Sequence, residues 1–176
     1  TPGNATYDNF RAQLVKVGDA FAALQENGVV ILFAPFHEAN NHNETPSFWW
    51  DGKDPPHYRA LWRYVHDYLT GERGLRNIVW VYAATMYYDV AEYYPGDGYV
   101  DVVGLDYHSK NGRFDFPKAI SNYNDLLICD KPFAATELSQ CGGEDSCGGL
   151  DARVIIDDLS GNFPEAVYWY NWDDHE

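Results

Sequence analysis

Five short apolar runs alternate with amphipathic stripes along this chain, and that alternation restricts the fold more than any other feature. Runs in which nearly every residue is apolar are typical of parallel strands covered on both faces. Stripes with a spacing of three and four residues predict helices. The predicted strands are residues 29–36, 78–83, 99–106, 131–137 and 166–172, and the predicted helices are residues 8–27, 54–69, 116–128 and 150–160. The alternation predicts an α/β fold with a parallel sheet and no internal linker.

Functional side chains follow the carboxyl ends of the predicted strands. They are His37 and Glu38, Asp106 to His108, Glu137, and Trp172 with Asp173. This placement is typical of the active face of a (β/α)8 barrel and equally of the ligand face of an open α/β sheet. A full barrel takes roughly 250 residues, whereas this chain has 176. If the fold is a (β/α)8 TIM barrel, we therefore expect about five of its eight βα units here.

Two glutamates stand where buried strands open into loops. Alternation along a strand would place Glu38 on the face of Leu32, Ala34 and Phe36, and Glu137 on the face of Phe133 and Ala135. Each glutamate taken alone is also compatible with a solvent-exposed carboxylate beyond a strand end. The pair is more specific, because two carboxylates, one acid and one nucleophile, carry out glycoside hydrolysis.

The charge balance excludes some partners. The chain has 27 acidic and 12 basic residues, a net charge of −15, and it has no basic run that would bind nucleic acid. An anionic membrane surface is disfavoured for the same reason, and no segment approaches the ~18 apolar residues of a membrane span. The aromatic content of 16% fits a carbohydrate site, because sugars present flat C–H faces, although a tyrosine-rich core explains most of these rings.

The dipeptide His37–Glu38 invites a zinc interpretation, which we reject. Zinc peptidases use H-E-x-x-H on a helix, with the two histidines four residues apart. The next histidine here is His42, five residues on, in a segment rich in Asn and Thr. Nucleotide-binding and serine-hydrolase motifs are also absent from the sequence. We therefore expect neither a metal nor an organic cofactor.

Three cysteines and two sequons favour secretion. Cys141 and Cys147 bracket a glycine-rich loop that a disulfide would close, which leaves Cys129 either with a missing partner or as a buried thiol. The sequons at Asn4 and Asn43 match the N-glycosylation pattern. No signal peptide is visible, so a mature or trimmed chain is expected.

Four further side chains are candidate sugar contacts. Trp49 lies in the loop after the first predicted strand, either as a stacking platform or as part of a hydrophobic plug. Trp172 ends the last strand, on the face of Tyr168 and Tyr170. The last two candidates, Asp106 and His108, share a face at the end of the third strand, where they bind substrate or satisfy backbone donors.

Several motifs, in order along nearly the whole chain, resemble glycoside hydrolase family 26. They are Ala34-Pro-Phe-His-Glu38, Phe48-Trp-Trp, Leu61-Trp-Arg-Tyr64, Trp80-Val-Tyr82, Tyr94-Pro-Gly-Asp97, Asp101-Val-Val-Gly-Leu-Asp106 and Thr136-Glu137. The family contains mainly β-mannanases, with some β-1,3-xylanases and mixed-linkage glucanases, and its members are retaining (β/α)8 barrels. The resemblance implies that residues 1–176 are the C-terminal portion of such a catalytic domain. Strands 4 to 8 would be present, and the missing N-terminal part of the barrel would be a partner.

The resemblance also implies roles. Glu38 would be the acid/base and Glu137 the nucleophile, with His37, Asp106 and Trp172 contacting the sugar. The family often has Arg where Ala34 stands and a Trp at position 47 or 48, and the loop between Glu38 and Trp49 looks longer than usual. It commonly ends strand 6 with Asp-x-Tyr, where this chain has His108 in the third place, with Tyr107 one position early.

The function that follows is retaining endo-hydrolysis of β-1,4-mannosidic linkages in a polysaccharide or oligosaccharide. The alternatives are a β-1,3-xylanase or mixed-linkage glucanase of the same family, and a non-catalytic carbohydrate-binding protein.

Overall fold

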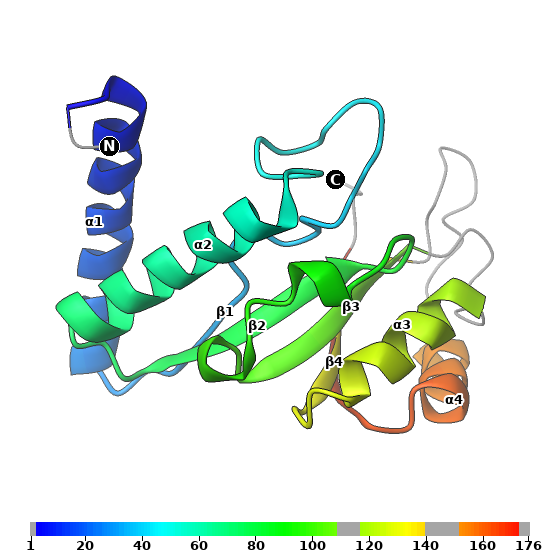
Figure 1. The fold of residues 1–176 in the computed structure, drawn as a ribbon. Coiled ribbons are helices and arrows are strands. Elements are labelled where there is room, and N and C mark those ends of the chain that lie inside the picture. Colours follow the sequence, from blue (N-terminus) through cyan, green and yellow to red (C-terminus); the bar gives the residue numbers. More distant parts are fainter. Residues whose placement is uncertain (1–2, 109–116, 140–151, 173–176) are drawn as a thin grey trace.

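A computed structural model describes residues 3–108, 117–139 and 152–172. Five parallel strands form one sheet in the order β1-β2-β3-β4-β5. Their bounds are Ile31–Phe33, Ile78–Thr85, Val102–His108, Phe133–Ser139 and Ala166–Asn171. Helices connect consecutive strands, except that β2 and β3 are joined by two short 3-10 turns, Ala91–Tyr93 and Asp97–Tyr99. The sheet curves as part of a (β/α)8 barrel, as the sequence predicts (Figure 1).

In the part of the chain that the structure describes, four α-helices connect or precede the strands. They are α1 (Ala5–Glu26), α2 (Pro55–His66), α3 (Pro117–Leu127) and α4 (Ala152–Asn162). Asn4 caps α1, and its side-chain oxygen accepts hydrogen bonds from the N–H groups of Thr6 and Tyr7. α2 begins at the proline pair after Asp54, as predicted. It runs directly into a π-helical segment, Asp67–Glu72, which the sequence pattern did not indicate.

The helices cover one face of the sheet, and the main core lies between the helices and that face. Leu14 of α1, Trp62 of α2 and Tyr123 of α3 belong to one buried cluster with the strand residues Tyr82 and Phe133. The other face would line the inside of a closed barrel. It carries a smaller cluster, made of Val81, Val102 and Ala134 with Val79 and Tyr168 packed against them.

The two ends of the sheet are open in the part of the chain that the structure describes. β1 pairs with β2 and β5 with β4, and neither end strand has a second neighbour. Apolar side chains remain exposed at both ends, including Leu32 at 56% and Val167 at 63%. An open edge of this kind presents unpaired backbone groups, which proteins normally cover.

The first strand is much shorter than the sequence predicts. The apolar run at residues 29–36 forms a strand only over Ile31–Phe33. Pro35 has no N–H to donate, and Phe36 has a left-handed backbone with φ of 54°. The chain therefore leaves the sheet three residues before the end of the predicted strand.

The predicted disulfide between Cys141 and Cys147 lies outside the described residues. Cys129 is a free, half-buried thiol, and burial raises its pKa. Among the described helices, none combines the length and apolar character that a membrane crossing needs.

Candidate active site

A cavity of about 470 Å³ opens at the carboxyl ends of the strands. Its polar lining comes from three different segments: His37 after β1, Asp106 on β3, and Thr136 with Glu137 on β4. Tyr168 and Tyr170 of β5 complete one wall. The topology thus gathers chemistry-bearing side chains that are far apart in the sequence.

Glu38 reaches this region through a turn and not by continuing a strand. Its backbone is left-handed, with φ of 54°, and its N–H donates to the carbonyl of Ala83 on β2 at 3.0 Å. The predicted shared face with Leu32, Ala34 and Phe36 is therefore wrong, because alternation ends with β1.

Asn40 holds the turn that carries Glu38. Its buried amide donates to the carbonyl of Thr85 at 3.0 Å and to that of Tyr88 at 3.2 Å. Its oxygen accepts from the N–H of Thr85 at 2.9 Å. These bonds fasten the loop after Glu38 to the end of β2, so that the backbone beside the carboxylate is fixed.

A β-bulge turns Glu137 into the cavity. Leu105 pairs with Ala135 while Asp106 pairs with Glu137, so Thr136 is an extra residue on β4. Phe133 and Ala135 lie in the core under the helices, whereas Thr136 and Glu137 both line the cavity. The predicted shared face of Phe133, Ala135 and Glu137 is therefore wrong, since the bulge reverses the alternation.

Asp106 is fully buried between the two glutamates. Its Oδ1 accepts a hydrogen bond from the hydroxyl of Thr136 at 2.6 Å, and its Oδ2 has no hydrogen-bond partner among the described residues. Burial and the neighbouring Glu137 carboxylate, with a smaller contribution from Glu38, raise the pKa of Asp106 well above its usual range, although the Thr136 hydrogen bond acts in the opposite direction. A neutral carboxylic acid at this position would be able to donate a hydrogen bond.

Each glutamate has a histidine beside it. The distance from His37 Nε2 to Glu137 Oε1 is 3.9 Å, and that from His108 Nε2 to Glu38 Oε1 is 3.7 Å. His37 directly precedes Glu38 in the sequence, but its side chain lies beside Glu137, and Glu38 has His108 of β3 as its neighbour. Asp106 and His108 lie on the same face of β3, as predicted, because both contribute to this cluster.

Tyr107 does not take the place of the tyrosine that the family commonly has two residues after the aspartate. It points away from the cavity into the core under the helices, where its ring lies 4.9 Å from that of Phe163. His108 occupies the position two residues after the aspartate, and its imidazole lies beside the carboxyl group of Glu38.

The two predicted tryptophan contacts lie outside this cavity. Trp49 packs edge-on against Phe10 of α1 and Phe36, with ring centroids 6.3 and 5.9 Å away. Trp172 follows β5 with 42% of its surface exposed, and its backbone N–H donates to the carbonyl of Leu138. Neither ring lines the cavity around Glu137.

The rings of Phe48 and Trp50 stack with their centroids 4.7 Å apart, and this contact fixes the loop near the site. The Trp50 indole N–H donates to the carbonyl of His37 at 2.9 Å. These rings therefore position the histidine beside Glu137, which is a structural use of the aromatic loop.

Sequence reasoning missed Thr136, Asn40 and Tyr168. The bulge that exposes Thr136 has no sequence signal that would separate it from a regular strand. Alternation in the sequence puts Tyr168 on the predicted strand face of Trp172, so the same reasoning would have identified it. Burial, and to a lesser extent the charge of Asp106, raise the pKa of Tyr168.

Comparison with known proteins decides the family. The family model described as glycosyl hydrolase family 26 matches residues 1–176. The chain belongs to glycosyl hydrolase family 26. Within the family, it is 32% identical to a mannan endo-1,4-beta-mannosidase of Bacillus subtilis, over 98% of this chain. It is 36% identical, over 94% of this chain, to the mannan endo-1,4-beta-mannosidase A and B of Caldalkalibacillus mannanilyticus.

A solved family 26 structure agrees with the fold. The Bacillus subtilis mannanase BCman superposes with a TM-score of 0.81 at 30% identity, over 97% of this chain. The chain spans only part of these relatives, namely 47% and 32% of the two mannosidases and 50% of the solved chain. A family 26 barrel of full size thus contains about twice the polypeptide present here.

Proposed function

We propose that the complete protein containing this chain is a retaining endo-β-1,4-mannanase. The observation that carries the proposal is the meeting of Glu38 and Glu137 around the buried Asp106, each with a histidine within 4 Å. Two carboxylates with different surroundings are what a glycosidase needs. The names of the two bacterial relatives, both mannan endo-1,4-beta-mannosidases, support mannan as the substrate.

In the first step Glu137 acts as the nucleophile. Its carboxylate attacks the anomeric carbon of the bound mannosyl unit and forms a glycosyl ester, while the bond to the leaving oxygen breaks. The carboxylic acid of Glu38 donates its proton to that oxygen, which departs as the hydroxyl of the released chain. His37, next to Glu137, and His108, next to Glu38, would orient the two carboxyl groups.

In the second step Glu38, now a carboxylate, accepts a proton from a water molecule. The water oxygen attacks the anomeric carbon, the ester bond to Glu137 breaks, and the β configuration is restored. Asp106 lies against Glu137 and would donate a hydrogen bond to that carboxylate while it is charged. Trp49 and Trp172 remain proposed sugar contacts further along the chain of substrate.

The enzyme would act outside the cell, because its polymeric substrate does not enter. The sequons and the Cys141–Cys147 pair are consistent with a secreted, disulfide-bonded glycoprotein. The remaining barrel strands would come from further polypeptide, which would cover the open edges of β1 and β5.

The test uses the complete protein on a panel of mannan, β-1,3-xylan and mixed-linkage glucan, with release of reducing ends as the readout. We expect hydrolysis of mannan and a first-formed product with the β configuration, observed by proton NMR. Glu137→Gln should abolish turnover, and Glu165→Gln, at an exposed glutamate outside the cavity, is the matched control. Normal turnover by Glu137→Gln, or hydrolysis of another polymer in preference to mannan, would refute the proposal.

A further inference from the structure

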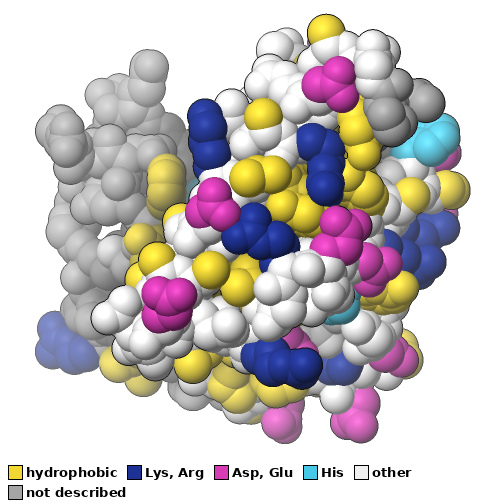
Figure 2. Space-filling model, turned by 90° about the vertical axis from the view of Figure 1, so that its left-hand side faces the viewer, with side chains coloured by type: hydrophobic (Ala, Val, Ile, Leu, Met, Phe, Trp, Pro, Cys, Tyr) yellow, Lys and Arg dark blue, Asp and Glu magenta, His cyan; other side chains and the backbone are white. Residues whose placement is uncertain are grey.

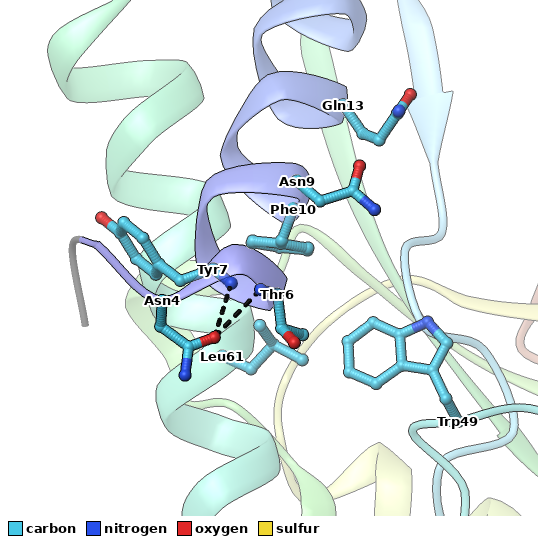
Figure 3. A pocket seen from close by; sticks show the side chains of 8 residues that line it. All are labelled: Asn4, Thr6, Tyr7, Asn9, Phe10, Gln13, Trp49 and Leu61. Carbon is cyan, nitrogen blue, oxygen red and sulfur yellow. Dashed lines mark hydrogen bonds between the residues drawn. The ribbon is translucent and has the colours of Figure 1, made fainter.

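A second cavity, of about 700 Å³, lies between the first turns of α1, Leu61 of α2 and Trp49 (Figure 3). Hydrophobic side chains gather on this face of the molecule, with charged side chains of both signs around them (Figure 2). The face lies on the side of the sheet where β1 has no second neighbour among the described strands. The rest of a family 26 barrel would pack there, so this cavity is no evidence of a free binding site.

The carboxyl ends of the inner strands depend much less on that further polypeptide. β2, β3 and β4 each have both of their sheet neighbours within this chain. Glu38 follows the edge strand β1, but its N–H is bonded to the carbonyl of Ala83 on β2. The contact between Glu38 and His108 of β3 is therefore set by residues that this chain itself supplies.

The imidazole of His108 lies close enough to Glu38 to influence its charge. His108 Nε2 is 3.7 Å from Glu38 Oε1, and the two side chains are 28% and 14% exposed. This distance is too long for a direct hydrogen bond, but a protonated imidazole and a carboxylate attract each other strongly at such a separation. Because both side chains are largely shielded from water, salt screens the attraction only weakly.

Tyr87, which follows β2, holds the backbone of His108. Its hydroxyl donates to the carbonyl of His108 at 3.0 Å. Burial, and to a lesser extent the charge of Glu38, raise the pKa of Tyr87, so the hydroxyl keeps its proton and remains a donor. On the opposite side, His108 pairs with Ser139 of β4. The end of β3 is thus fixed from both neighbouring strands, which sets the position from which the imidazole reaches Glu38.

The acidic groups around Glu38 act in the opposite direction to His108. Asp106 lies between the two glutamates, and the charges of both glutamates act on it. Nearby carboxylates favour the protonated form of a carboxyl group. The other histidine of the site, His37, lies 3.9 Å from Glu137. Among the described groups, His108 is therefore the one placed to stabilise the carboxylate of Glu38.

We propose that His108, held by Tyr87, stabilises the carboxylate form of Glu38 and thereby sets the upper pH limit of the first step, in which Glu38 must carry a proton. This rests on the proposed function, because it assigns His108 to the acid/base of that reaction as a positioning residue. The effect is largest below about pH 7, where a histidine side chain ordinarily carries its charge. The tyrosine that the family commonly has in this place has no positive charge to offer.

The test compares two substrates of the complete protein across the pH range, with kcat/KM as the readout of the first step. A manno-oligosaccharide has a leaving oxygen that needs the proton of Glu38. In His108→Gln, which keeps a polar side chain but has no charge, the alkaline limb of its profile should move to higher pH by about 0.5–1 unit. A β-mannobioside with a dinitrophenolate leaving group needs no proton, so its profile should not move.

Two further variants sharpen the comparison. Tyr87→Phe removes the hydroxyl that holds His108 and should move the alkaline limb in the same direction by a smaller amount. His57→Gln is the matched control, because it makes the same exchange at an exposed histidine of α2 that pairs with Asp54 at 3.1 Å. It should leave both profiles unchanged.

A second measurement does not depend on catalysis. Coupling between two titrating groups is reciprocal, so Glu38→Gln should shift the titration of the His108 imidazole to lower pH by a similar amount. Proton NMR of the imidazole signals follows this titration, and the signal of His108 is assigned by its loss in His108→Gln.

The outcomes separate the role of His108 from the catalytic proposal. An alkaline limb that stays in place in His108→Gln would overturn the role, and so would an equal loss on both substrates at every pH, which indicates a merely structural residue. A His108 titration that ignores Glu38→Gln would also overturn it. If the parent protein hydrolyses neither substrate while the His108 titration responds to Glu38, the coupling is supported and the mannanase proposal is refuted.

Discussion

Asp106 and Glu137 face each other across β3 and β4, and the extra residue Thr136 is what brings the carboxyl group of Glu137 to the cavity beside Asp106. Regular pairing would have turned Glu137 toward the helices. The bulge thus sets two acidic groups side by side in a place where water is excluded from one of them. Burial and the charge of Glu137 then favour the neutral form of Asp106 by raising its pKa.

The first prediction concerns stability against pH. Because the pKa of Asp106 is raised in the folded protein, its favourable contribution is fully present below the unfolded pKa, near 3.8. That contribution is lost as pH rises through the folded value. Asp106→Asn removes the titration, so the stability of the variant relative to wild type should increase between pH 4 and pH 7. Urea unfolding of the complete protein at several pH values measures this difference, and a difference independent of pH would contradict it.

The second prediction separates the two glutamates by leaving group. Glu38→Gln removes the proton donor, so hydrolysis of mannan should fall by about 10²–10⁴-fold. A mannoside with a nitrophenolate leaving group needs no proton at departure, so its first step should be nearly preserved, giving a burst of nitrophenol. Glu137→Gln should lose both the burst and the turnover. A burst from Glu137→Gln and none from Glu38→Gln would reverse the two assignments.

The third prediction concerns Gly104, which lies under the bulge on the neighbouring strand. A Cβ at this position would lie 2.4 Å from Cγ2 of Thr136 and 2.8 Å from the carbonyl oxygen of Ala134. Gly104→Ala should therefore cost about 1–3 kcal/mol of unfolding free energy through overpacking, and it should lower activity by displacing Thr136. Gly98→Ala is the control, because its Cβ would meet no atom within 4 Å. Equal melting temperatures for the two variants would show that the bulge has more room than its geometry indicates.

The fourth prediction concerns the turn behind Glu38. Asn40→Ala leaves the carbonyl and N–H of Thr85 without their partner inside the protein, at a cost of about 1–3 kcal/mol. The loosened turn should also lower kcat, because Glu38 lies two residues away. Glu44→Ala, in the exposed part of the same loop, should change neither. Thermal melting and mannan hydrolysis, measured on the same preparations, check both effects.

The sequence identifies the fold and the elements well, because these depend on local periodicity. The stripe of α1 and the proline pair at the start of α2 predict helices within a few residues of their observed bounds. The five strands and their parallel order follow from the alternation of elements. The open sheet is consistent with the expectation that only part of a barrel is present.

The route by which the glutamates reach the site is where sequence reasoning fails. Strict alternation places Glu38 and Glu137 on faces that the structure does not have, since one lies beyond a truncated strand and the other beside a bulge. Both deviations depend on tertiary contacts, such as the bond from Glu38 to Ala83, and they leave no periodic trace. Trp49 was predicted as a sugar contact from its residue type, but its ring lies outside the cavity around Glu137. Residue type alone does not reveal on which side of the loop the ring lies.

The left-handed backbone of Glu38 has a consequence for how the protein evolves. A residue with a Cβ pays roughly 1 kcal/mol or more for that conformation, while glycine adopts it freely. Glu38→Gly would relax the turn and also remove the carboxylate, so under the proposed mechanism the variant that folds more easily would be inert. Selection for stability alone would therefore favour loss of this side chain, whereas the proposed chemistry would retain it despite the strained backbone.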